Sequence, residues 1–294
     1  MAPTFILQLV LSGLAVGSVY ALVALGFALI FATVRVVNFA QGELVMVGAL
    51  TGYSAHVALG LPLPLAALLS GAVTVLVALA TERLAVHPLR DLRSSIAWVM
   101  STLGVGLMLR SGAAALWGKA PLPFPAPFGS GRVLIGGLAF VPQEALTFLL
   151  AIGAMALLET LRRRTIVGKA MRAAAFSLDA ARLVGINISS TSLLAFGASA
   201  ALAALAGILI APISNASSEM GTLLGIKGFA AAAVGGLGTF QGALAGGLIL
   251  GLVEVLAAGL LWPGFSDVAA FLLLILILLA RPAGLFGQPE ALRA

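Results

Sequence analysis

Long apolar segments, separated by short polar stretches, make up most of the sequence. A helix needs about 20 mostly apolar residues to cross the hydrocarbon layer of a bilayer, so the pattern predicts nine membrane segments. Their approximate bounds are 5–32, 37–58, 63–82, 94–116, 141–161, 190–212, 222–239, 241–261 and 267–280. The seventh and ninth are the weakest, and each is a candidate for a re-entrant segment or a short half-helix. The sequence therefore predicts an all-α, polytopic integral membrane protein of about eight to nine transmembrane helices, forming a single domain over residues 1–294.

The composition indicates that lipid is the outer solvent. Hydrophobic residues make up 61% of the chain and charged residues only 9%, whereas about 25% of a soluble domain is charged. The absence of cysteine excludes disulfides and thiolate metal sites. Small residues spaced by four let helix backbones approach closely in lipid, which predicts a tightly packed bundle. Three glycine pairs have this spacing: Gly13 with Gly17, Gly242 with Gly246, and Gly247 with Gly251.

The basic residues predict how the chain is oriented. The net charge is +6, but the basic residues are sparse and lie mainly between apolar runs, so we interpret them as a topology signal and expect no nucleic-acid partner. With nine spans, the main basic positions fall on one side, which predicts a cytoplasmic C-terminus and an N-terminus outside. These positions are Arg35, Arg83, Arg90, Arg93, Arg162, Arg163, Arg164, Lys169, Arg172, Arg182, Arg281 and Arg293. Residues 1–4 carry no basic side chain, so we expect the first segment to be retained and not cleaved as a signal peptide.

Residues 117–140 form the longest predicted outside loop. Four alternating prolines forbid a helix here and favour extended chain; they are Pro121, Pro123, Pro125 and Pro127. The segment is either a loop at the membrane interface or a docking surface for an extracytoplasmic partner.

Motifs of enzyme sites are missing from the sequence. It has neither the G-x-x-x-x-G-K-[ST] phosphate loop nor H-E-x-x-H nor G-x-S-x-G, and its only histidines are His56 and His87. We therefore expect no ATP site of that type, no catalytic residues, no metal and no cofactor in this chain.

The predicted inside loop, residues 162–189, contains an amphipathic pattern. Its alanine- and leucine-rich part favours one helix over 168–184, which Gly185 would end. One side of this helix would hold Met171, Ala174, Ala175, Leu178 and Ala181. The other would hold Lys169, Arg172, Asp179 and Arg182, and Asp179 is three residues from Arg182 and suited to pair with it. Such a helix lies on anionic lipid or inserts into a groove of a cytosolic partner.

Within this helix the run Asp179-Ala180-Ala181-x-x-x-Gly185 resembles the E-A-A-x-x-x-G coupling motif of bacterial ABC importer permeases, with Asp in place of Glu. The resemblance implies contact with an ATPase. The predicted coupling residues are Arg172, Asp179, Ala180, Ala181, Arg182 and Gly185.

Polar side chains also lie inside apolar segments. Asn38, Gln41 and Glu43 stand at the start of the second segment, and Glu254 lies within the eighth. An ionised carboxylate in the membrane costs at least a few kcal/mol unless it is hydrated or partnered. Glu43 is therefore either part of a substrate pathway or an acid that the positive N-terminal end of a helix stabilises. Glu254 is either a pathway residue or a hydrogen-bond partner between helices.

Several blocks, in order along nearly the whole chain, resemble the LivH-type permease family of branched-chain amino acid ABC transporters. They include the run from Leu14 to Glu43, the stretch from Gly168 to Asn187, the glycine-rich run from Phe229 to Gly247, and Arg281-Pro-Ala-Gly-Leu-Phe-Gly287. The resemblance implies an importer subunit of the bacterial inner membrane. Its expected partners are a LivM-like second permease, two cytosolic ATPase subunits that bind the ATP, an extracytoplasmic binding protein, and membrane lipid.

Three alternatives stay open at this point. The first keeps the ATP-driven importer but changes the solute to an amide, a urea or a sugar. The second is a proton-coupled secondary transporter with Glu43 and Glu254 as the proton carriers. The third is a passive channel.

Overall fold

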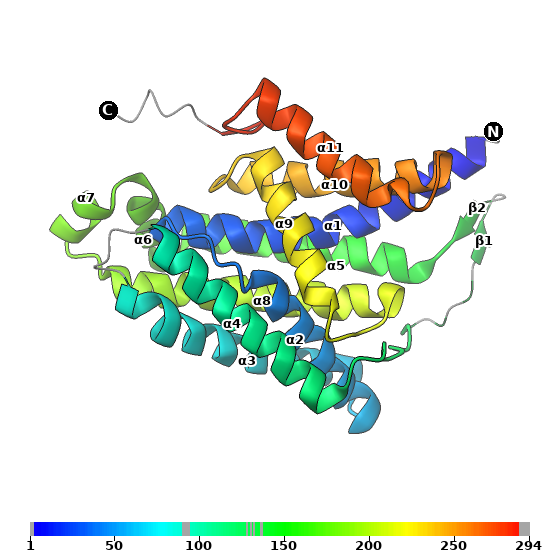
Figure 1. Cartoon of the computed structure of the whole chain (residues 1–294), viewed down its shortest axis with the longest axis horizontal. Coiled ribbons are helices and arrows are strands. Elements are labelled where there is room, and N and C mark those ends of the chain that lie inside the picture. Colours follow the sequence, from blue (N-terminus) through cyan, green and yellow to red (C-terminus); the bar gives the residue numbers. More distant parts are fainter. Residues whose placement is uncertain are drawn as a thin grey trace.

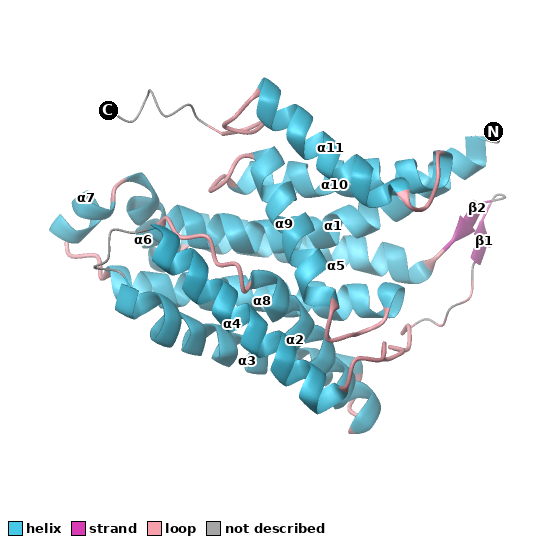
Figure 2. Ribbon diagram, viewed as in Figure 1, coloured by secondary structure: helices cyan, strands magenta, loops and turns pink. Residues whose placement is uncertain are grey.

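The computed structural model describes residues 3–89, 95–127, 129, 131, 133–135 and 138–287. Helices dominate this part of the chain, as predicted (Figure 2). They are α1 (Pro3–Val34), α2 (Gln41–Tyr53), α3 (Leu63–Thr81), α4 (Ser95–Trp117), α5 (Pro142–Arg164), α6 (Ile166–Phe176), α7 (Leu178–Leu183), α8 (Ile188–Ser214), α9 (Met220–Gly235), α10 (Phe240–Leu260) and α11 (Phe265–Ala280). Short turns of π or 3₁₀ helix extend two of them: η1 (Ser54–Ala58) after α2, and η2 (Glu82–Val86) with η3 (His87–Leu89) after α3.

Each of the nine predicted segments coincides with a helix, but they differ in length. Six helices of the described chain are long and apolar enough to cross a membrane. The predicted seventh and ninth segments are the 16-residue helices α9 and α11, which confirms that they are short. The second segment was expected to span, yet α2 has only 13 residues before it continues as η1. The chain therefore combines full spans with shorter helices.

One small sheet interrupts the predicted Pro-rich loop. Strands β1 (Val133–Ile135) and β2 (Leu138–Phe140) pair antiparallel, with Val133 opposite Phe140. The described residues around the four prolines are non-helical, as expected, and Leu122 forms an isolated bridge with Ala216. The sequence pattern did not predict the hairpin.

Helix α1 forms the centre of the bundle and packs against α5, α8, α9 and α10 (Figure 1). Most of its apolar stretch is buried, so the helix is hydrophobic all round, as expected for a central position. The predicted glycine contacts are present. A Cβ on Gly251 of α10 would lie 2.2 Å from the Cα of Gly17 in α1, so only glycine permits this crossing.

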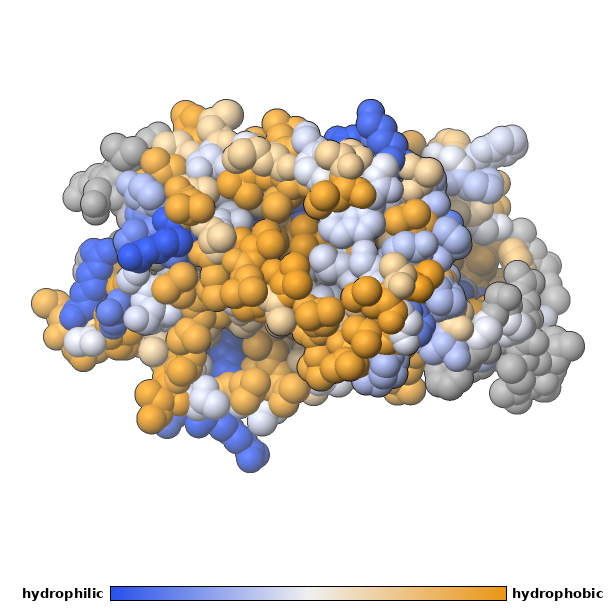
Figure 3. All heavy atoms as spheres, turned by 90° about the horizontal axis from the view of Figure 1, so that it is seen from below, coloured by the Kyte–Doolittle hydropathy of each residue, from blue (hydrophilic) through white to orange (hydrophobic). Residues whose placement is uncertain are grey.

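The outer surface is apolar over wide areas. Figure 3 shows one face covered mainly by hydrophobic residues, with hydrophilic residues concentrated near its margins. Large side chains such as Leu68, Leu76 and Leu149 are exposed on the outer helices. Such a surface suits contact with lipid tails.

The two ends of the bundle differ. Figure 1 shows the N-terminus and the β1–β2 hairpin at one end, and α6 and α7 at the other. Helix α2 begins near the middle of the bundle, between α4 and α9, and both helices pack against it.

Candidate functional site

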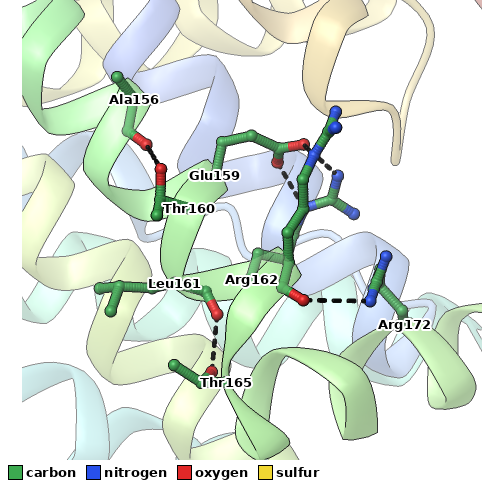
Figure 4. Close-up of polar contacts among 8 residues, drawn as sticks. Ala156, Glu159, Thr160, Leu161, Arg162, Thr165 and Arg172 are labelled. Carbon is green, nitrogen blue, oxygen red and sulfur yellow. Dashed lines mark hydrogen bonds and ion pairs between the residues drawn. The ribbon is translucent and has the colours of Figure 1, made fainter.

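Most of the predicted functional residues lie in two regions of the structure, the helix pair α6–α7 at one end and the start of α2 beside a cavity, whereas Glu254 lies apart from both, in α10. At the first, Glu159 closes the last turn of α5 by accepting hydrogen bonds from Arg162, at 2.7 and 3.0 Å, and from Arg163 (Figure 4). Arg172 of α6 donates to the Arg163 carbonyl at 3.5 Å. A Cβ on Gly168 would lie 2.2 Å from the Arg162 carbonyl oxygen, so a glycine is needed for α6 to fold back this tightly on α5.

The prediction of one amphipathic helix over 168–184 is wrong, because the helix is interrupted at Ser177, between α6 and α7. Ser177 is extended, and its hydroxyl accepts the backbone N–H of Ala180 at 3.2 Å. A serine that satisfies a free N–H in this way starts a new helix. The predicted loop 162–189 is thus mostly helical: α5 extends to Arg164, and α8 begins at Ile188.

The predicted burial pattern is partly preserved across the break. Met171, Ala174 and Ala181 are buried, as expected for the inner side. The ends of the two helices are instead strongly exposed, with 92% of Phe176 and 89% of Leu183 accessible. Val184, next to Leu183, is also 76% exposed, so the end of α7 presents neighbouring apolar side chains, and contiguous exposed apolar surface is typical of a region that a partner covers.

Gly185 ends α7, as predicted. Its φ of +83° is readily adopted only by glycine. The N–H of Gly185 donates to the Arg182 carbonyl, and the N–H of Ile186 donates to the Ala181 carbonyl, both at 3.0 Å. This pair of bonds is a Schellman motif, which satisfies the last carbonyls of a helix.

The remaining predicted coupling residues lie on α6 and α7. Arg172, Ala180 and Arg182 are exposed. The side chain of Asp179 lies outside the described part of the structure, so its predicted pairing with Arg182 stays a prediction. A contact that the sequence did not indicate joins α6 to the central helix: Arg35, at the end of α1, donates to the Ala175 carbonyl at 2.8 Å.

The polar residues at the start of α2 are all buried, but they have different roles. Asn38 accepts the N–H of Ala40 at 3.1 Å and closes the turn before the helix. Gln41 accepts from the Ser199 hydroxyl of α8 at 2.9 Å and so links two helices. Of the three, Glu43 lines the cavity.

This cavity has a volume of about 340 Å³ and lies between α4 and α9, with α2 as its floor. Its size is near the lower end of the roughly 300–1,000 Å³ typical of small-molecule sites. Three phenylalanines form one apolar part of its wall: Phe229 lies 5.7 Å from Phe27 and 5.8 Å from Phe39, between ring centroids. Leu103 and Ile226 continue the apolar wall, as expected for a ligand site with few polar groups.

Glu43 is held where the first turns of α2 and α9 meet. Its Oε1 accepts from the Thr222 hydroxyl at 2.7 Å, and its Oε2 is buried without a hydrogen-bond partner. Close packing of glycines brings the helices together, since a Cβ on Gly42 would lie 2.2 Å from the Gly221 carbonyl oxygen. A carboxylate near two helix N-termini is stabilised by their dipoles.

Arg110 of α4 is the basic residue of the cavity wall, and the sequence reasoning missed it. It interacts electrostatically with Glu43 and forms a 3.1 Å ion pair with Glu219, at the start of α9. The available signal was an arginine inside an apolar segment, which is rare without a functional or structural reason.

A second residue that the sequence reasoning missed, Lys227, explains how the carboxylate of Glu254 is accommodated inside an apolar helix. The Lys227 ammonium in α9 lies 2.6 Å from Glu254 in α10 and 2.7 Å from Asp267 in α11, and 5.7 Å from the ring centroid of Tyr20 in α1. The cluster joins four helices. The Lys227–Glu254 bond favours the interpretation of Glu254 as a hydrogen-bond partner between helices. The signal here was a lone lysine among apolar residues, with acids in the two following segments.

Comparisons with known proteins agree with this architecture. The model of the family described as "Branched-chain amino acid transport system / permease component" matches residues 9–280. The LivH permease protein of Escherichia coli K12 is 33% identical over 97% of both chains, and the BraD permease protein of Pseudomonas aeruginosa is 34% identical over 97% of this chain and 96% of its own. The LsrC permease protein of an Enterobacter autoinducer 2 import system is 33% identical over 87% of this chain and 74% of its own. The chain therefore belongs to the permease-component family of branched-chain amino acid transport systems.

Proposed function

We propose that the chain is the transmembrane permease subunit of an ATP-driven importer of branched-chain or other apolar amino acids. Its family and the names of the relatives LivH and BraD support the substrate class. The observation that carries the mechanism is the projecting pair α6–α7, with exposed Phe176 and Leu183 at its ends. In the bacterial inner membrane, this end of the bundle faces the cytoplasm and the N-terminus lies outside, in accord with the positive-inside rule.

Coupling to ATP hydrolysis follows from how α6–α7 is attached. The pair α6–α7 sits in a cleft of the ATPase dimer, with Arg172, Ala180, Arg182 and Gly185 forming the contact together with Asp179. Ala181, predicted as a coupling residue, is buried and supports the contact from inside the pair. Closure of that dimer moves the pair. The Arg35 bond to Ala175 and the packing of α6 on α5 transmit the movement to the central helices, and access to the pathway switches sides.

The complex needs four further kinds of component. Two cytosolic ATPase subunits bind and hydrolyse ATP, so the permease itself has no catalytic site and binds no cofactor. A LivM-like second permease completes the pathway, and an extracytoplasmic protein binds the amino acid and docks outside. Membrane lipid covers the apolar outer face.

A different small solute is the second candidate. The LsrC relative covers most of this chain, and its name refers to autoinducer 2 and not to an amino acid. Uptake assays should therefore compare leucine with amides, urea and sugars.

The test is the variant Leu183→Asp in the reconstituted complex, with Leu183→Met as the matched control. The aspartate puts a charge into the proposed apolar contact and should reduce both co-purification of the ATPase and ATP-driven leucine uptake, whereas methionine should preserve them. Normal uptake by Leu183→Asp would contradict docking through α7. Uptake driven by a proton gradient without any ATPase would instead favour a secondary transporter.

A further inference from the structure

The cavity between α4 and α9 offers complementary groups for a free amino acid. Glu43 lines this cavity, and its Oε2 is buried without a hydrogen-bond partner, while the residue as a whole is 6% exposed. A buried carboxylate oxygen without a partner is costly, so it is a strong acceptor for a ligand that brings donors. A primary ammonium has three donors and a positive charge, and it matches this atom.

Thr222 fixes the direction in which this oxygen points. Its hydroxyl donates a hydrogen bond to Oε1 of Glu43, so Oε2 is the carboxylate oxygen that lacks a hydrogen-bond partner. Gly221 contributes in another way, because a Cβ there would lie 2.3 Å from Oε2. Only glycine lets the carboxylate lie this close to the start of α9. The first turn of α9 therefore both orients the carboxylate and permits its close approach.

Arg110 supplies the opposite charge on the α4 wall. Its Nη2 already donates to Glu219, but a guanidinium has five N–H donors and can bind a second carboxylate. Its side chain is 39% exposed, so some of it remains accessible. The cavity therefore holds one carboxylate and one guanidinium with a free donor edge, which is the charge pattern that complements a zwitterion.

The rest of the wall determines what kind of side chain fits. It is formed by Phe27, Phe39, Phe229, Leu103, Leu107 and Ile226. Such a wall has no hydrogen-bond partner to offer to a polar side chain, and it favours an aliphatic or aromatic one.

The geometry points to this cavity as a transient binding site for an apolar amino acid, with its ammonium on Glu43, its carboxylate on Arg110 and its side chain against the phenylalanines. The inference rests on the proposed function and adds where the permease itself touches the substrate. The site is small and only partly enclosed, so it holds the amino acid weakly and releases it as the helices move.

The absence of cysteine from the natural sequence permits a direct test. A cysteine at Ile226, which lines the cavity and is 49% exposed, is labelled with a small cationic methanethiosulfonate reagent in the complete complex in lipid nanodiscs. Leucine should slow the labelling of Ile226→Cys. Leu59→Cys, in a turn at the end of η1, is 68% exposed and does not line the cavity, so leucine should leave its labelling unchanged.

A second substitution tests the role of the carboxylate. In the Ile226→Cys background, Glu43→Gln should raise the leucine concentration needed for half-protection about ten- to a hundredfold, as expected for the loss of a charge-assisted bond. The matched control is Glu144→Gln, since Glu144 lies in a separate cavity and accepts from Ser12. This control should leave protection unchanged.

The outcomes separate this inference from the proposed function. Equal labelling of Ile226→Cys with and without leucine, in a complex that still imports leucine with ATP, would overturn the binding site and leave the importer intact. Protection that survives Glu43→Gln would overturn the role of Glu43. Absence of ATP-driven uptake of every tested solute by the unmodified complex would contradict the proposed function itself.

Discussion

Replacing Lys227 tests whether charge holds the short helix α9 in place. Lys227→Met removes the ammonium that neutralises Glu254 and Asp267 and retains most of the aliphatic volume. The Glu254 side chain is 12% exposed, so its carboxylate would be left buried and without a cation, whereas Asp267 is 51% exposed and can be solvated or move. Most of the effect should therefore come from Glu254.

The expected size follows from the energetics of buried ion pairs. Removing one partner of such a pair destabilises a protein by about 3–5 kcal/mol, because an uncompensated charge remains. For a chain of this size the loss corresponds to a fall in the unfolding midpoint on the order of 10 °C. Adding Glu254→Gln to Lys227→Met should recover most of it, because the neutral amide no longer needs a cation.

Thermal unfolding of the purified chain in detergent, followed by size-exclusion chromatography after heating, measures these midpoints. Lys227→Arg provides the control that keeps the charge. The reasoning would be refuted if Lys227→Met unfolded within about 2 °C of the parent, well under the shift expected for an unpaired buried charge. It would also be refuted if the double variant were no more stable than Lys227→Met alone.

Two glycine substitutions test local geometry. Gly185→Ala forces a side chain into the left-handed region and should destabilise the α7 end by about 1–2 kcal/mol, which faster proteolysis of that segment would reveal. The control is Gly153→Ala, because a Cβ at that position meets nothing within 4 Å. Equal proteolysis of the two variants would count against the role of Gly185. Gly42→Ala should separate α2 from α9 and lower the unfolding midpoint by an amount equivalent to about 1–3 kcal/mol of overpacking. Its control is Gly71→Ala, where the added Cβ meets nothing within 4 Å, and this variant should leave the unfolding midpoint unchanged. An unchanged midpoint in Gly42→Ala would refute the close contact between α2 and α9.

The helices were readily predictable because hydropathy and length determine them. Every predicted segment corresponds to a helix, and the predicted shortness of α9 and α11 is confirmed. The break at Ser177 was missed because alanine-rich sequence on both sides favours helix, and only the hydroxyl's bond to Ala180 reveals the new start. Local capping outweighed propensity at that position.

The candidate site was predicted only in part, since its members come from distant parts of the chain. Glu43 was identifiable by its charge in an apolar segment, and Gly185 by its motif. Thr222 and Arg110 belong to other helices, and only the packing of α2 against α4 and α9 brings them to Glu43. The apolar pattern within each helix marks unusual residues such as Arg110, but it carries no signal for which residues meet between helices.

The exposed ion pair of Arg110 with Glu219 has a consequence for how the subunit stands in its complex. Other sides of the bundle expose leucine side chains, which suit contact with lipid tails. Lipid tails solvate charged groups poorly, so they do not suit the exposed Arg110–Glu219 pair. The rotation of the subunit about the membrane normal is thereby restricted, because the α4–α9 edge must turn toward water or a neighbouring polypeptide. A permease inserted with that edge toward the bilayer would be misassembled even if every helix were correctly folded.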